Sequence, residues 1–198
     1  MNDEQQYSTS KLLVLALCLL ACSSRVCAAQ SKCASLADGE TSGHTYTNKE
    51  IGLSYTFPES LRLEPAAKYP KDKTGRLLLV LWKSPPDLPK PSVLILADDP
   101  SAYRDATAIG YARRIENTVR SYDPPGTITQ NAKEYDVAGV KFYRVEYQFP
   151  QPNPAYNVAI TGQVRNCEIS FEFTGRTKQE IEALIPSIDA IRFSNPSP

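Results

Sequence analysis

The sequence predicts an α+β domain in which an antiparallel β-sheet is sandwiched between helices, an α-β-α arrangement. Two segments, 76–82 and 92–97, are apolar on both faces, and such strands need something packed on each side of their sheet. Other segments alternate apolar with polar residues and are joined by short turns, which force antiparallel pairing. Two stretches with helical spacing of apolar residues supply the expected cover.

Length and charge narrow the class of protein. A chain of 198 residues suggests one domain, long enough to bury a core. Its 22 basic and 22 acidic residues cancel, whereas a protein that binds nucleic acid needs a basic surplus. We therefore expect no nucleic-acid partner.

Residues 1–28 indicate a signal peptide. Residues 12–21 form an apolar run that is too short to span a bilayer, which takes about 20 residues, but is typical of a signal-peptide core. Val26, Cys27 and Ala28 resemble a cleavage site. One alternative is a lipoprotein signal that ends before an acylated Cys22; another is an uncleaved anchor. All three interpretations place the domain outside the cytoplasm, in the periplasm or the extracellular space. In the lipoprotein alternative, the lipid on Cys22 anchors the protein to the membrane.

The remaining cysteines indicate a disulfide. After cleavage before Ala29, Cys33 and Cys167 are the two that remain, and two cysteines in an oxidising compartment favour one bridge between them. The alternative is two separate buried thiols.

The folded domain is expected at residues 45–194, after a small and polar linker at 29–44 and before a short tail at 195–198. It opens with a hairpin, whose turn is Asn48–Gly52 because Asn and Gly tolerate left-handed backbone. Leu53, Tyr55 and Phe57 then alternate with polar residues, which gives a strand with one apolar face.

A helix is predicted to begin at Asp99–Pro100, with proline in its first turn, and to end before Asp123–Gly126. Its apolar residues recur at helical spacing: Ala108, Ala112, Ile115, Val119 and Tyr122. Strands are predicted at 127–135, 140–149, 156–164 and 167–173. Thr177 and Glu180 form a capping box that opens a terminal helix, which Pro186 kinks or splits.

Four segments together resemble the PsbP-like family of photosystem II extrinsic proteins, Ran-binding release factors and bacterial envelope proteins. They are the opening Tyr46–Pro58, the helix at 101–121, Val137–Tyr147 and Ile188–Ser194. The resemblance covers residues 45–194. It implies an α-β-α sandwich and mostly non-enzymatic roles in binding and assembly.

Catalytic groups are sparse in the sequence. His44 is the only histidine and lies in the expected linker, so neither a hydrolase triad nor a zinc site is predicted, and we expect no cofactor. Asp98 and Asp99 form a carboxylate pair that we assign to helix capping. Glu168 and Glu172 share a strand face, where they either bind a cation or form a solvated sheet surface.

Two surfaces are candidates for binding a partner. Cations line the long helix at Arg104, Arg113, Arg114 and Arg120, where they bind an anionic lipid head group or a protein, or pair with Glu116. A second surface gathers the polar sides of several strands: Ser54, Thr56, Arg144, Glu146, Gln148, Ser170 and Glu172. The strand aromatics are assigned to the core, with a ligand pocket as the alternative: Tyr55, Phe57, Trp82, Tyr143, Tyr147, Phe171 and Phe173.

The sequence therefore predicts an exported, non-enzymatic binding or adaptor domain whose partner is an envelope protein. One alternative is a carrier of a small ligand or lipid, which needs a cavity of at least about 300 Å³. The other is a hydrolase that uses carboxylates.

Overall fold

The computed structural model describes residues 33, 35–64, 74–83, 91–150 and 155–194. The predicted signal peptide, Cys22 and the tail lie outside these residues. The described residues belong to one unit, Ser31–Pro198. None of their helices is long and apolar enough to cross a bilayer.

The larger of two sheets has seven strands in the order β4-β5-β6-β10-β9-β8-β7, and every pair is antiparallel. Its strands are β4 (Leu61–Glu64), β5 (Gly75–Lys83), β6 (Ser92–Asp98), β7 (Thr127–Val137), β8 (Val140–Phe149), β9 (Ala155–Val164) and β10 (Cys167–Gly175). The predicted strands are thus present, and β4 is an addition that the sequence analysis missed.

A smaller sheet contains the opening hairpin and the C-terminal strand. Its order is β1-β2-β3-β11, and its strands are β1 (Glu40–Ser42), β2 (Thr45–Asn48), β3 (Leu53–Thr56) and β11 (Ile191–Phe193). The predicted turn is confirmed, because Asn48 Oδ1 accepts hydrogen bonds from the amides of Glu50 and Ile51 at 3.1 and 3.3 Å and Gly52 has φ +68°.

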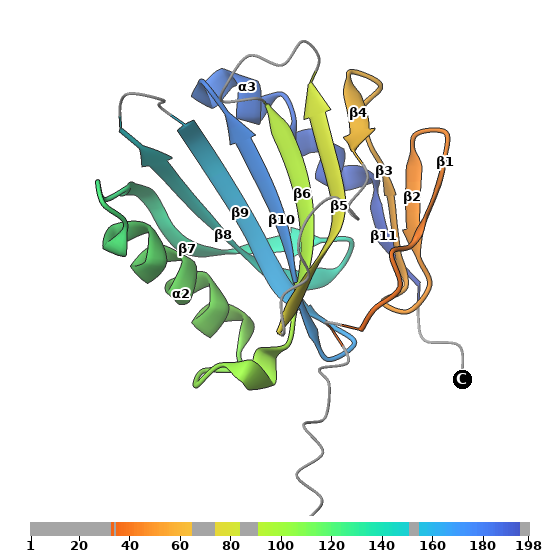
Figure 1. The fold of residues 1–198 in the computed structure, drawn as a ribbon, viewed down its shortest axis with the longest axis horizontal. Helices are drawn as coiled ribbons and strands as arrows, with labels where there is room; N and C mark the ends of the chain where they lie inside the picture. The colour runs from red at the N-terminus through yellow and green to blue at the C-terminus, as the bar shows by residue number, and fades with distance from the viewer. Residues whose placement is uncertain (1–32, 34, 65–73, 84–90, 151–154, 195–198) are drawn as a thin grey trace, which may run out of the picture. The chain divides into compact units, whose positions relative to one another are not determined.

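The predicted sandwich between helices is corrected on one side. Helix α2 (Ala108–Ser121) lies against β7, β8 and β9 on one face of the large sheet (Figure 1). The other face is covered by the smaller sheet together with the terminal helical segments. Pro186 splits the terminal helix into two short segments, α3 (Lys178–Glu182) and the 3₁₀ helix η3 (Ile185–Ala190). They add Ile181, Leu184, Ile185 and Ile188 to the same core, but they do not form a helical layer by themselves.

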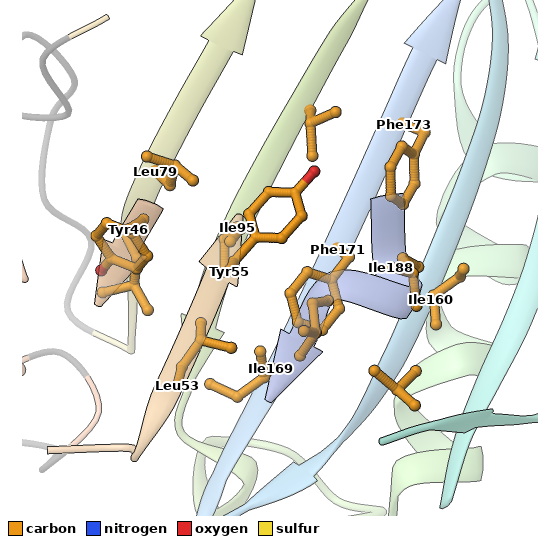
Figure 2. Packing of buried hydrophobic residues seen from close by; sticks show 14 of the residues in the cluster. Tyr46, Leu53, Tyr55, Leu79, Ile95, Ile160, Ile169, Phe171, Phe173 and Ile188 are labelled. Carbon is orange, nitrogen blue, oxygen red and sulfur yellow. The ribbon is translucent and has the colours of Figure 1, made fainter. Parts of the chain in front are cut away.

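The core fills the space between the two sheets. Figure 2 shows Leu53 and Tyr55 of the smaller sheet directed toward the strands that carry Ile95 and Phe171. Ile95 and Phe171 are fully buried, and Tyr55 is 1% exposed. The Tyr55 hydroxyl is hydrogen-bonded to Ser187 Oγ at 2.7 Å, so this aromatic residue brings no unpaired polar group into the core.

The segment before the hairpin is part of the folded unit. Residues 29–44, the expected linker, include strand β1 and the buried Leu36 in their described part. Cys33 and Cys167 form a disulfide across a sequence separation of 134 residues, with 5.6 Å between their Cα atoms. The bridge joins this segment to the start of β10.

The long helix begins later than its sequence predicts. Asp99 caps a separate short 3₁₀ helix, η2 (Pro100–Ala102), by accepting a hydrogen bond from the Ser101 amide at 2.9 Å. Asp105 then bonds the hydroxyl of Thr107 at 2.6 Å, and Thr107 caps α2 by accepting from the Gly110 amide at 3.1 Å. Two consecutive side-chain caps therefore interrupt the segment that we expected to be continuously helical.

Candidate functional site

A cleft of about 400 Å³ runs along α2 where the helix meets the large sheet. We call it the α2 cleft. Its lining residues are Tyr103, Tyr111, Arg114, Ile115, Thr118, Val119, Tyr122, Tyr147, Phe149 and Glu172. A volume of this size falls within the range that holds small organic ligands.

Helical periodicity builds one wall of the cleft. Tyr111, Ile115 and Thr118 recur at spacings of four and three residues, so they lie along one side of α2. The wall extends to Tyr122, which follows the helix and is 55% exposed. Eleven residues at 1.5 Å each give this wall a length of roughly 16 Å.

Aromatic rings stand at both ends of the α2 cleft. At the start of the helix, the rings of Tyr103 and Tyr111 pack edge to face, 6.1 Å apart. At its end, Phe149 packs edge to face with Tyr122 at 5.4 Å and with Tyr147 at 5.8 Å. These contacts hold the rings in defined orientations, which favours a preformed binding site.

Arg114 binds to the first of these aromatic pairs. Its guanidinium carbon lies 3.3 Å from the centre of the Tyr103 ring and 4.4 Å from that of Tyr111. Each contact is within the range of a cation–π interaction. The rings therefore already present their electron-rich faces to one cation.

The floor of the cleft carries a carboxylate. Glu172 lies on β10 between Leu94 of β6 and Ala159 of β9. Burial, followed by the negative charge of Asp98, raises the pKa of Glu172 to about 7. No hydrogen bond or ion pair of Glu172 is found within the described part of the chain, so its oxygens are available to a donor.

Two neighbouring carboxylates are occupied by the protein itself. Asp98 Oδ2 accepts a hydrogen bond from the Tyr111 hydroxyl, and Glu168 Oε1 accepts one from Thr161 at 2.7 Å. Burial raises the pKa of Glu168 to about 7, although the Thr161 hydrogen bond and then the charge of Arg114 oppose the rise. Glu168 is only 1% exposed, so it lies beneath the cleft and does not line it.

The structure separates the residues predicted to form a polar sheet surface. Ser170 and Glu172 lie on the face toward α2, and Ser170 is fully buried. Arg144 and Glu146 lie on the opposite face and form an ion pair at 2.8 Å. Gln148 follows them on that face, whereas Ser54 and Thr56 belong to the smaller sheet. These seven residues do not share one surface.

The structure also divides the basic residues of the helix. Arg113 and Arg120 are exposed, and Arg120 forms the predicted pair with Glu116 at 3.7 Å. Glu116 has a further role, because it accepts a hydrogen bond from the Ala132 amide of β7 at 2.6 Å. Of Arg113, Arg114 and Arg120, only Arg114 lines the cleft.

Apart from Tyr147, which lines the α2 cleft, the other sequence candidates lie away from the cleft or inside the protein. His44 is exposed and packs edge to face against Phe57 at 5.3 Å. Of the aromatic set, four residues are buried in the core: Tyr55, Phe57, Phe171 and Phe173. The other three, Trp82, Tyr143 and Tyr147, are half-buried.

Sequence reasoning missed most of this site. Tyr103 and Tyr111 were not candidates, and Tyr122 was assigned to the apolar stripe of the helix. The available signal was that Tyr111 and Thr118 continue the helical spacing on one side of the apolar stripe, next to its members Ile115 and Tyr122.

The fold and the cleft together define an α+β domain of PsbP-like fold with a site of ligand size. The solution structure of cyanobacterial PsbP (CyanoP) from Synechocystis sp. PCC 6803 matches 79% of this chain and 98% of its own chain, with TM-score 0.55 and 17% identity. A crystal structure of LpqN, involved in cell envelope biogenesis of Mycobacterium tuberculosis, matches 70% of this chain and 78% of its own, with TM-score 0.43 and 9% identity. A scan against protein-family models and a search of curated proteins found no match. The match to the cyanobacterial PsbP structure confirms, for the fold, the resemblance found in the sequence.

Proposed function

We propose that this chain is an exported, non-enzymatic binding domain of the cell envelope that holds a small amphipathic molecule in the α2 cleft. The observation that carries the proposal is the cleft itself, about 400 Å³ and lined by five aromatic rings, one arginine and one carboxylate. Apolar walls with a few polar groups are the usual composition of a small-molecule site. An adaptor role toward an envelope protein remains compatible with this function, since the ligand can be delivered to a partner.

The carboxylates favour a second candidate, a hydrolase. Glu168 and Glu172 both have a pKa of about 7, which suits a general acid or base. However, Glu172 is the only one of the two that lines the cleft, and two carboxylates must flank a bond for the common glycosidase mechanisms. Binding is therefore the function that the geometry supports better.

Filling the cleft tests the binding function. Thr118 is exposed and lines the cleft, whereas the adjacent Asn117 is exposed and does not. Phenethyl alcohol, an uncharged aromatic probe, is titrated into the ¹⁵N-labelled chain lacking residues 1–28, and amide shifts are followed by NMR. We expect shifts confined to α2, β8 and β10, with a dissociation constant on the order of millimolar for so small a probe.

The matched variants decide the outcome. Thr118→Trp places a large ring in the cleft and should weaken the probe at least about tenfold, a loss of about 1.4 kcal/mol. Asn117→Trp adds the same ring outside it and should bind as the unchanged protein does. Shifts spread over both faces of the sheet, or equal binding by the two variants, would contradict the proposal. Turnover of chromogenic glycosides or esters that Glu172→Gln abolishes would favour the hydrolase instead.

A further inference from the structure

The carboxylate of Glu172 lacks the partner that its neighbours have. An ionised carboxylate only accepts hydrogen bonds, and partial burial without a donor or a cation is unfavourable. Asp98 receives the Tyr111 hydroxyl and Glu168 receives the Thr161 hydroxyl, whereas no residue in the described ranges donates to Glu172. The floor of the α2 cleft therefore has an unmet need for a positively charged or donating group.

The charges around Glu172 increase this need. Asp98 lies on the neighbouring strand β6, and its charge raises the pKa of Glu172 further. Tyr111 of α2 and Tyr147 of β8 also face Glu172, and burial raises the pKa of each hydroxyl, so both stay neutral at ordinary pH. Arg114 lowers the pKa of Glu168, and its guanidinium lies over the rings of Tyr103 and Tyr111.

The aromatic rings at the far end of the cleft are suited to a cation. Tyr122, Tyr147 and Phe149 line this end, and within the described part of the chain no arginine or lysine lies over their rings. The faces of such rings attract ammonium groups, most strongly where water is displaced. Arg114 shows the same preference at the other end of the cleft.

We propose that the α2 cleft binds an organic cation, an ammonium group on an apolar body, with Glu172 as its counter-ion and the cleft tyrosines around it. This inference rests on the proposed function, because it names the chemical class of the molecule that the cleft holds. A neutral donor such as a hydroxyl can bond the Glu172 carboxylate but leaves its charge uncompensated, and an anionic group placed beside Glu172 is repelled by that carboxylate and by Asp98. Complementary charge therefore selects the cation.

Three probes of similar shape test the charge of the ligand: phenethylamine, phenethyl alcohol and hydrocinnamate, which carry positive, zero and negative charge. Each is titrated by NMR at about pH 8, above the pKa of Glu172, which is about 7. We expect phenethylamine to bind at least about tenfold more tightly than the alcohol, since hydrogen bonds to charged groups are the stronger ones. Hydrocinnamate should bind most weakly.

Two carboxylate variants locate the effect. Glu172→Gln should remove the preference for the amine, so that phenethylamine and phenethyl alcohol bind with similar affinity. Glu182→Gln, on α3 and exposed, should keep the preference. If the alcohol binds as tightly as the amine, or Glu172→Gln keeps the preference, the cation inference is overturned and the binding function stands. If none of the three probes binds, both fail.

The pH dependence supplies a second readout. Phenethylamine stays protonated over the range used, so its affinity should rise as pH increases from about 5.5 through 7 and Glu172 loses its proton. In Glu172→Gln the affinity should not change over this range. An unchanged slope in this variant would assign the titration to another group and overturn the role of Glu172.

Discussion

The two faces of the large sheet are made by the same strands, yet their chemistry differs. One row across the sheet joins Ile95, Phe171 and Ile160, all fully buried toward the smaller sheet. The next row joins Leu94, Glu172 and Ala159 and faces α2. Because side chains alternate along a strand, a shift of one residue changes an apolar core into the floor of a binding cleft.

The covers of the two faces differ as well. The smaller sheet closes the core face with buried residues such as Tyr46 and Leu53, and η3 adds Ile188. On the other face, α2 lies against β7, β8 and β9, and the α2 cleft lies beside the helix. We conclude that the core face supplies most of the stability and that the α2 face is free to carry polar groups that a core would not accept.

The largest expected effect is on the disulfide that joins the segment before β1 to the large sheet. Cys33→Ala together with Cys167→Ala removes a bridge that spans 134 residues. In the chain-entropy model, closing a loop of this length contributes about 5 kcal/mol. Urea unfolding of the variant should show a loss of this order, while phenethyl alcohol should still bind to the α2 cleft at low denaturant. An equal stability of the oxidised and reduced native protein would contradict this expectation.

The next effect compares one ring from each face. Phe171→Ala empties a fully buried site in contact with the ring of Phe142, 5.8 Å away, and should cost about 3–5 kcal/mol. Tyr147→Ala removes a half-buried ring of the cleft and should cost about 1 kcal/mol. Both free energies of unfolding come from the same denaturant titrations. Similar losses for the two variants would mean that the faces do not divide their roles as we infer.

The stability of the fold should depend on pH through the buried Glu168. The pKa of Glu168 is raised from 4.5 to about 7 in the folded chain. Between these two pH values the folded state therefore keeps a proton on Glu168 that the unfolded state has lost. Its stabilising contribution is complete below about pH 4.5 and is lost as pH rises through about 7, a change of about 3 kcal/mol. Glu168→Gln should remove this part of the pH dependence and be the more stable protein at about pH 8.

Glu182→Gln is the matched control, because its side chain is 52% exposed. Its free energy of unfolding should follow that of the unchanged protein from about pH 4 to pH 8. The prediction would be wrong if Glu168→Gln showed the same pH profile as this control.

Much of the fold was predictable because it depends on local patterns. The hairpin turn follows from Asn48 and Gly52, and the strands β5 and β6 follow from apolar runs that only a covered sheet accepts. The identity of the cover was not predictable in this way. The second layer of the fold includes a sheet in which β3, residues 53–56, pairs with β11, residues 191–193. These two strands lie so far apart in the sequence that no local pattern encodes their pairing.

The candidate site was predictable only in part, for a related reason. Glu172 and Arg114 were identified as polar residues at the surface, but the sequence placed them on different surfaces. Their proximity depends on how α2 crosses the sheet, which is decided by packing of residues such as Ala112 and Val119. The raised pKa of Glu172 depends on Asp98, which lies 74 residues earlier in the chain according to their numbers.

The smallest effect tests whether the cleft wall can loosen without the core. Thr107 caps α2 by accepting a hydrogen bond from the Gly110 amide at 3.1 Å, and Thr107→Ala should cost about 1 kcal/mol. The loss should appear as faster hydrogen exchange at Gly110 and Tyr111, because the first turn of the helix opens locally. Exchange in β10 should change less, since its amides are paired on both sides with β6 and β9. If hydrogen exchange in β10 instead becomes faster by the same factor as in the helix, the two faces unfold together. The faces would then differ in their side-chain chemistry but not in their stability.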